Sequence, residues 1–228
     1  MDDSIKVILL MLLFLVFAPA AGYLIRGTRP LQQLAFFLMV FLSVGHVDHT
    51  MVSPGFGEFY RGHTRGYEFT LMEVMAVVLL FAGRGKPQER GPWFPPGADL
   101  WLIYCLVASI SIFNSVNANF TMMATVKYVK ILVIFMATFH FLREEADLHY
   151  WLKTIAILLI FQSFLAMYQK YVEGRYPVEA WFEHQNPLAM YSYMLALPLL
   201  AAGLAAPRGS QTAWYLSGFI GGAVCVQS

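Results

Sequence analysis

The sequence predicts an all-α, polytopic transmembrane helical bundle of about eight spans. Of its 228 residues, 58% are hydrophobic and only 13% are charged, and the mean hydropathy is +0.58. A soluble domain normally carries about 25% charged residues. The apolar residues also come in long uncharged runs, and crossing a bilayer takes about 20 such residues. A helix suits these runs because it satisfies its own backbone hydrogen bonds inside the membrane.

Eight apolar runs approach the length of a span, and their ends are set only to within a few residues. Together they make residues 1–228 a single transmembrane domain. The run from Ala213 reaches Ser228 after about 16 residues, short of a full crossing, which predicts the N-terminal part of a longer protein. The predicted spans are 5–25, 31–46, 68–83, 99–114, 121–142, 151–168, 187–205 and 213–228.

The first run is either a signal peptide or a retained span. Residues 7–25 carry no charge, and Ala18-Pro19-Ala20 loosely imitates a cleavage site. However, the preceding MDDSIK has two acidic residues and one lysine, and the run is long for a signal sequence. We therefore interpret it as a retained first span.

Lysines and arginines in the loops set the orientation, because cytoplasmic loops carry more of them. They follow spans one, three, five and seven. The N-terminus and the loops 47–67, 114–120 and 169–186 then face outward. Two interpretations remain open for the basic residues of the outward loops: they bind an anionic partner, or they are ordinary solvated charges. These residues are Arg61, Arg65, Lys170 and Arg175.

Several functional classes have no support in the sequence. The net charge of +1 and the lack of a basic tract give no indication of nucleic-acid binding. Cys105 and Cys225 lie inside apolar runs, so neither a disulfide framework nor a cysteine metal motif is predicted. Phosphate-binding glycine loops and a nucleophile elbow are also missing, which leaves nucleotide-driven transport and serine hydrolysis unsupported.

Span five holds the least expected charges. Lys127 and Lys130 lie three residues apart, on one helix face, about two turns in from the outward end at Thr121. Ionisable residues inside a membrane usually face a bundle interior or a polar cavity, where this pair suits a pyrophosphate. Alternatively, both side chains snorkel to the outer headgroups. Glu73 in span three is the natural counter-charge for either lysine, in a pair that is functional or purely structural.

Four residues in the first outward loop or directly before it raise the question of a metal site. His46 and His49 have helix-compatible spacing, but Asp48 is a weak third ligand and no H-E-x-x-H framework accompanies them. With His63, they are interpreted as interfacial or loop residues. No metal and no cofactor is predicted.

The stretch 181–189 joins a polar, aromatic loop to a new apolar run. Asn186 is a good helix N-cap and Pro187 suits the first helical position, so a helix with exposed N–H donors is predicted here. This helix end is either an anion-binding site at the membrane surface, or the Asn-Pro pair only marks the start of a transmembrane helix. The preceding loop contains aromatic rings, which are typical of the membrane interface and also form flat surfaces against sugar rings. It also contains basic groups that could bind phosphate, and two carboxylates. These residues are Tyr171, Tyr176, Trp181 and Phe182, then Lys170, Arg175 and His184, then Glu179 and Glu183.

This stretch resembles the bacterial O-antigen ligase and polymerase family. Members often show a Gly-x-Phe-x-His-x-Asn-x-x-Ala pattern that opens a helix on the outward side. His184, Asn186 and Ala189 match the pattern, and Phe182 fits its aromatic place. Ala180 stands where glycine is usual. Residues 65–68 and 166–170 also look similar to members, and the hydropathy and loop layout extend the resemblance over most of the chain.

The resemblance implies a multi-pass glycosyltransferase of envelope polysaccharide assembly in the bacterial inner (cytoplasmic) membrane. Its donor would be a glycan on an undecaprenyl-pyrophosphate carrier, and its acceptor a lipid, a polymer or a protein. Family members carry their catalytic histidine and arginine in a later outward loop, so the resemblance implies that this chain ends before the catalytic half. His184 and Asn186 carry over as motif residues, and the others rest on physical inference. The predicted donor-pyrophosphate site is Lys127, Lys130, Arg175, His184 and Asn186, supported by Glu73.

Two other classes stay open. A transporter or channel-like protein for a lipid or small anion would use broken helices that point at a midplane site. Here the motif helix is predicted to start at the outer interface, and Pro198 is the only proline deep in span seven, which favours interfacial chemistry. The third class is a truncated relative without activity.

Overall fold

The computed structural model describes residues 3–44, 69–83, 93–115, 118–182, 185–207 and 209–227. Of these residues 83% are helical and none forms a strand, which confirms the predicted all-α class. Four helical runs among them are long and apolar enough to cross a membrane. They are Val7–Ile25, Thr121–Phe141, Glu145–Tyr171 and Gln185–Ala205.

A helix occupies each of the eight predicted spans over its described residues. The shorter apolar helices, however, contain fewer residues than the roughly 20 that a straight crossing takes. They are Arg29–Leu42, Leu71–Ala82 and Ala98–Asn114. The number of crossings therefore stays a prediction, whereas the helical character of each run is established.

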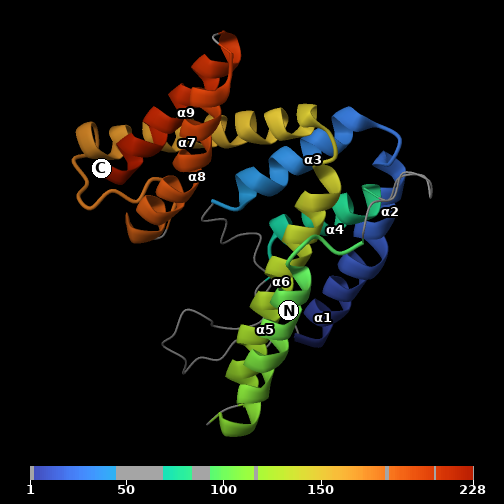
Figure 1. Cartoon of the computed structure of the whole chain (residues 1–228). Helices are drawn as coiled ribbons and strands as arrows, with labels where there is room; N and C mark the ends of the chain where they lie inside the picture. The colour runs from blue at the N-terminus through green and yellow to red at the C-terminus, as the bar shows by residue number, and fades with distance from the viewer. Residues whose placement is uncertain are drawn as a thin grey trace. The chain divides into compact units, whose positions relative to one another are not determined.

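The chain divides into two compact units. Unit 1 comprises Met1–Met39 and Val47–Arg143, and unit 2 comprises Val40–His46 and Glu144–Ser228. Unit 1 begins with one helical run made of α1 (Asp3–Leu12), the π-helical η1 (Leu13–Phe17) and α2 (Ala18–Ile25). Its further elements are α3 (Arg29–Leu42), α4 (Leu71–Ala82), α5 (Ala98–Ile110), the 3-10 turn η4 (Ser111–Asn114) and α6 (Ala118–Phe141) (Figure 1).

In unit 1, α4 packs against both α2 and α6. Gly22 allows the approach of α2, since a Cβ added there would lie 2.7 Å from the Cβ of Phe81. The end of α6 is fixed to the start of α3, because Arg29 donates a hydrogen bond of 3.1 Å to the carbonyl oxygen of Phe141. Phe36 stacks on the Phe141 ring with the centroids 4.1 Å apart.

Unit 2 is built from the end of α3 and from α7 (Glu145–Tyr171), α8 (Gln185–Ala205) and α9 (Ser210–Gln227). Figure 1 shows α8 and α9 side by side, and α9 packs on α7 as well. The three long helices share one buried apolar cluster. Its members are Leu152, Ile155, Ala156, Leu159, Ala196, Leu199 and Tyr215.

Candidate functional site

A capping box places the start of α4. The helix begins at Leu71, three residues later than the predicted span, because Thr70 and Glu73 satisfy its first turn. The backbone N–H of Thr70 donates to Oε2 of Glu73 at 2.6 Å, and the Thr70 hydroxyl donates to the same oxygen. One carboxylate oxygen of Glu73 is thereby used within α4.

The other oxygen of Glu73 binds Lys130. Its Oε1 lies 2.8 Å from Nζ of Lys130, and the two side chains are only 5% and 17% exposed. The predicted pairing of Glu73 with a lysine of span five is therefore confirmed for Lys130. The same ammonium lies 5.6 Å from the centroid of the Phe69 ring, a cation–π distance. The snorkelling alternative does not describe this side chain.

Both lysines lie deeper along α6 than predicted. The helix begins at Ala118 instead of Thr121, which puts Lys127 nine residues and Lys130 twelve residues after its first residue. At 1.5 Å per residue these positions are about 13 and 18 Å along the helix axis. Lys127 is half-buried and precedes Lys130 by about one turn.

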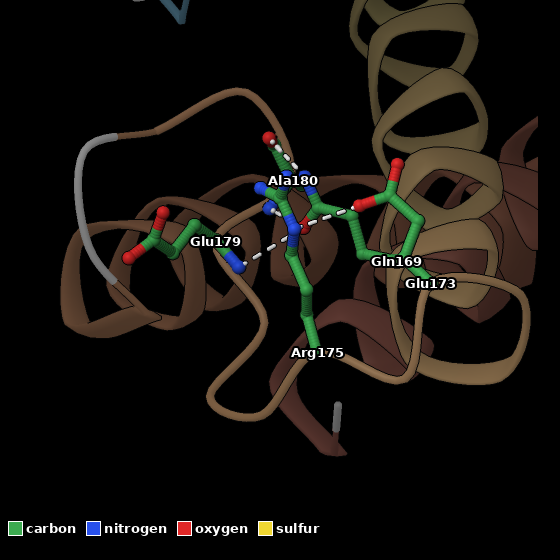
Figure 2. Close-up of polar contacts among 5 residues, drawn as sticks. All are labelled: Gln169, Glu173, Arg175, Glu179 and Ala180. Atoms are coloured by element: carbon green, nitrogen blue, oxygen red, sulfur yellow. Dashed lines mark hydrogen bonds and ion pairs between the residues drawn. The ribbon is translucent and has the colours of Figure 1, made fainter.

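In unit 2 a glutamine side chain holds the loop that leads into α8. Oε1 of Gln169 accepts the backbone N–H groups of Glu179 and Ala180 at 3.2 and 2.7 Å. Its Nε2 donates to the carbonyl oxygen of Ala180 at 2.9 Å. Figure 2 shows this three-bond contact, which we call the amide clamp. One neutral side chain thus fixes two successive loop residues against α7.

A second glutamine acts one residue further on. Gln162 is fully buried, and its Oε1 accepts the backbone N–H of Trp181 at 3.2 Å. The Trp181 ring packs against Phe41 and Phe161, with centroid distances of 5.3 Å in both cases. Between the two glutamine contacts, Ala180 has a φ of 49°, in the left-handed region that favours glycine.

Arg175 lies in the same loop and faces solvent or headgroups. Its side chain is 64% exposed, and its Nε lies 2.8 Å from Oε2 of Glu173 (Figure 2). Its backbone N–H donates to the carbonyl oxygen of Gln169 at 2.9 Å. An exposed ion pair of this kind contributes little to stability, so the guanidinium can exchange its partner at small cost.

The predicted cap at the start of α8 is wrong. The helix begins at Gln185, so Asn186 lies within the first turn instead of capping it, and Pro187 is the third helical residue. Proline is tolerated there because the first four N–H groups of a helix have no intrahelical acceptor. Gln185, Asn186 and Pro187 are all exposed.

Several predicted residues lie outside the described residues. These are His184 and Glu183 of the motif stretch, and His46, Asp48, His49, His63, Arg61 and Arg65 of the first outward loop. Of the predicted pyrophosphate site, Lys127, Lys130 and Glu73 belong to unit 1, and Arg175 and Asn186 belong to unit 2. The structure brings Lys130 and Glu73 together, and a single site spanning both groups stays a prediction.

Three residues that position these groups were not predicted to do so. The role of Thr70 could have been predicted from the sequence, because Thr-x-x-Glu before an apolar run is the pattern of a capping box. Gln162 is a neutral amide inside the apolar run of α7 and Gln169 follows at its end, and such residues usually find a polar partner across a helix interface. That signal points to a contact without identifying the partner, which here is a loop backbone.

A scan against protein-family models gives no match for this chain, and searches of curated proteins and of solved structures give none either. The functional argument therefore depends on the residues and their geometry.

Proposed function

We propose that this protein is a multi-pass glycosyltransferase of the O-antigen ligase and polymerase type in the bacterial inner membrane. It would take a glycan from an undecaprenyl-pyrophosphate carrier and pass it to a lipid, polymer or protein acceptor. The observation that carries the proposal is the φ of 49° at Ala180. The family pattern has glycine at this place, and a left-handed backbone is the physical reason for a glycine.

The arrangement around Ala180 supports this proposal further. The glutamine contacts hold residues 179–181 of the loop that leads to α8. The N-terminal end of α8 carries a partial positive charge that favours an anion. In the proposed reaction the acceptor hydroxyl attacks the anomeric carbon and the pyrophosphate leaves. Cations and helix donors would stabilise the charge that develops on the leaving group.

Two rival functions differ in what they need from the fold. A transporter of a lipid or small anion would favour helices interrupted near the midplane. Here α8 continues from Gln185 to Ala205 past Pro198, and the first helical run continues through its π-helical turn. These continuous helices favour chemistry at the membrane surface over transport. A relative without activity would retain the fold and lose donor binding, which the experiment below measures.

The proposed orientation has a direct test. Residues 169–186 should face outward and residues 84–98 inward, because basic residues concentrate in inward loops. Single cysteines at positions 88 and 179, on a background without Cys105 and Cys225, are treated with an impermeant thiol reagent in intact cells. We expect label at 179 only. Label at 88 without label at 179 would reverse the orientation.

Donor binding tests the function itself. The protein in lipid nanodiscs should bind an undecaprenyl-pyrophosphate glycan, and Lys127→Ala should weaken binding about ten- to a hundredfold. This range corresponds to the loss of one charge-assisted hydrogen bond, roughly 1.5–3 kcal/mol. Lys130→Ala would also leave Glu73 without its ion pair, so its effect on binding would include a structural loss.

A conservative variant separates charge from structure. Lys127→Arg keeps the cation and should retain most of the affinity. Wild-type protein that does not bind the donor, or a Lys127→Ala variant that binds it normally, contradicts the proposed site. Deleting the gene in its native host should also leave glycan accumulated on the carrier, and an unchanged glycan pattern would argue for one of the rivals.

A further inference from the structure

An open groove of about 280 Å³ lies in unit 1 where α5 passes into η4 and meets α6. The described residues that line it are Ala108, Ser111, Thr121, Ala124, Thr125 and Tyr128. The α6 positions recur at helical spacing and so form one face of that helix. All lining side chains except Tyr128 are small, which explains why two contacting helices leave a hollow here.

The lining combines hydroxyl groups with a larger apolar surface, and none of its described residues carries a charge. Four of the six lining residues have a hydroxyl group. Ser111 Oγ donates to the Ala108 carbonyl oxygen at 2.6 Å, and Thr125 Oγ1 donates to the Thr121 carbonyl oxygen at 3.0 Å. Because these protons are used, both oxygens are left as hydrogen-bond acceptors. A ligand that donates hydroxyl hydrogens fits such a lining, whereas an anion needs donors.

Tyr128 supplies an aromatic wall of the groove. The backbone carbonyl oxygen of Tyr128 accepts a hydrogen bond of 3.0 Å from Nε1 of Trp101. The Tyr104 ring meets the Tyr128 ring edge to face, with centroids 5.1 Å apart and planes at 77°. A ring held in this way offers a flat apolar surface beside the hydroxyl groups. A pyranose has the complementary features, an apolar C–H face and a rim of hydroxyl groups.

The groove also lies close to the cation of the proposed donor site. Lys127 directly precedes Tyr128 on α6, about 100° around the helix from it. The α6 residues of the groove lie between one and six residues from Lys127, which is about 1.5 to 9 Å along the helix axis. In a carrier-linked glycan, the first sugar is bonded directly to the pyrophosphate. A sugar in the groove would therefore bring the phosphate charge into the neighbourhood of Lys127.

We infer that this groove binds one uncharged pyranose ring of the donor glycan, the ring attached to the pyrophosphate. The inference rests on the proposed function and adds a sugar subsite to it. The groove holds about 280 Å³, which is below the roughly 300–1,000 Å³ of pockets that enclose drug-sized ligands, so a single ring suits it better than a longer glycan.

Three probes test the subsite on the protein in lipid nanodiscs. They are a short-prenyl pyrophosphate that carries one hexose, the same prenyl pyrophosphate without sugar, and the same prenyl hexoside without phosphate. Wild-type protein should bind the first about tenfold more tightly than the second, as expected for one or two neutral hydrogen bonds. The third probe should bind weakly.

Substitutions in the groove should remove only the contribution of the sugar. Thr125→Val deletes an acceptor oxygen with little change of shape, and Ala124→Leu fills the hollow. Each of these variants should bind the prenyl pyrophosphate with a hexose and the prenyl pyrophosphate without sugar with the same affinity. Ala118→Leu is the matched control, because Ala118 is exposed at the start of α6 and does not line the groove. Thermal unfolding identifies any variant that fails to fold.

The outcomes separate this inference from the proposed function. Equal binding of the first two probes by wild-type protein overturns the sugar subsite and leaves the pyrophosphate site standing. Binding of the phosphate-free hexoside alone, lost in Thr125→Val, supports a sugar site in the groove and overturns the carrier as its source. A sugar-dependent gain in affinity that survives in both groove variants places the sugar elsewhere and overturns the inference. Protein that binds none of the probes overturns both proposals.

Discussion

Two polar contacts, one in each unit, are built by different means. In unit 1, the Glu73 carboxylate and the Lys130 ammonium form an ion pair at 2.8 Å between α4 and α6. In unit 2, the amide clamp of Gln169 and the buried Gln162 hold a loop backbone through neutral hydrogen bonds of 2.7 to 3.2 Å. One contact joins two helices, and the other joins a helix to the segment that begins the next helix.

The difference has a physical consequence. A buried charge needs its partner, because the desolvated ion that remains after the loss of that partner is strongly unfavourable. A neutral amide that loses a partner costs less, since its desolvation penalty is smaller. Substitution in the Glu73–Lys130 pair of unit 1 should therefore cause a large loss of global stability. Substitution of Gln169 in unit 2 should cause a local change in the order of its loop.

The largest effect should follow from removing the Glu73 carboxylate. Glu73→Leu leaves Lys130 beside an apolar side chain at a site where both residues are largely buried. Breaking a buried pair in this way typically lowers the free energy of unfolding by about 3–5 kcal/mol. Loss of the cap on Thr70 adds to this, by about 1 kcal/mol. Thermal or denaturant unfolding in detergent micelles measures the change.

A double variant shows whether the unpaired charge is the cause. Combining Glu73→Leu with Lys130→Met removes both charges and should recover most of the lost stability, as seen for other buried pairs replaced by apolar residues. If Glu73→Leu alone costs less than about 1 kcal/mol, the lysine reaches water or headgroups on its own, and the contrast between the units disappears.

An intermediate effect is expected for Gln169→Ala, which removes all three bonds of the amide clamp. The free energy of local opening at residues 179 and 180 should fall by about 1–3 kcal/mol, because two backbone N–H groups lose their acceptor. Amide hydrogen exchange at these residues should accelerate at least about fivefold, with little change in the global unfolding temperature.

Gln169→Glu is the matched variant for the amide clamp. It keeps acceptor oxygens for Glu179 and Ala180 and loses only the donor, so its exchange rates should lie between those of the wild type and the alanine variant. A global loss of stability similar to that of Glu73→Leu would show that the loop is part of the core of unit 2.

The difference between an ion pair and an amide–backbone contact also explains which of the two could be predicted from the sequence. Charges inside apolar runs are expensive and must be paired, so Glu73 could be matched to a lysine of span five without coordinates, but the choice between Lys127 and Lys130 could not be made. The partner of Gln169 could not be predicted, because it is the backbone of the loop, and any sequence supplies the same N–H and C=O groups. The fold class followed from hydropathy alone, whereas the division into two units depends on which helices touch.

The start of α8 shows a second limit. Asn-Pro is a common helix opening, and it predicted Asn186 as the cap, yet the helix begins at Gln185. A polar residue and a proline are both allowed anywhere in a first turn whose N–H groups lack intrahelical partners, so the pattern identifies the turn and leaves its register open. In contrast, the capping box at Thr70 defines the register of α4 because two side chains must meet across three residues.

The smallest effect should come from Ala180→Gly, and it has the opposite sign. Ala180 has a φ of 49°, where a side chain costs about 1–2 kcal/mol relative to glycine. Glycine loses about 0.5–1 kcal/mol through its greater freedom in the unfolded chain, so the net gain should be about 0.5–1 kcal/mol. Unfolding measurements should show a small rise in stability, and donor affinity should stay the same or increase. Ala202→Gly, within α8, is the control and should lower stability by about 1 kcal/mol, because the helical backbone gains nothing from glycine. If both variants are destabilised alike, the left-handed conformation at Ala180 does not limit stability, and the match to the family's glycine loses its physical basis.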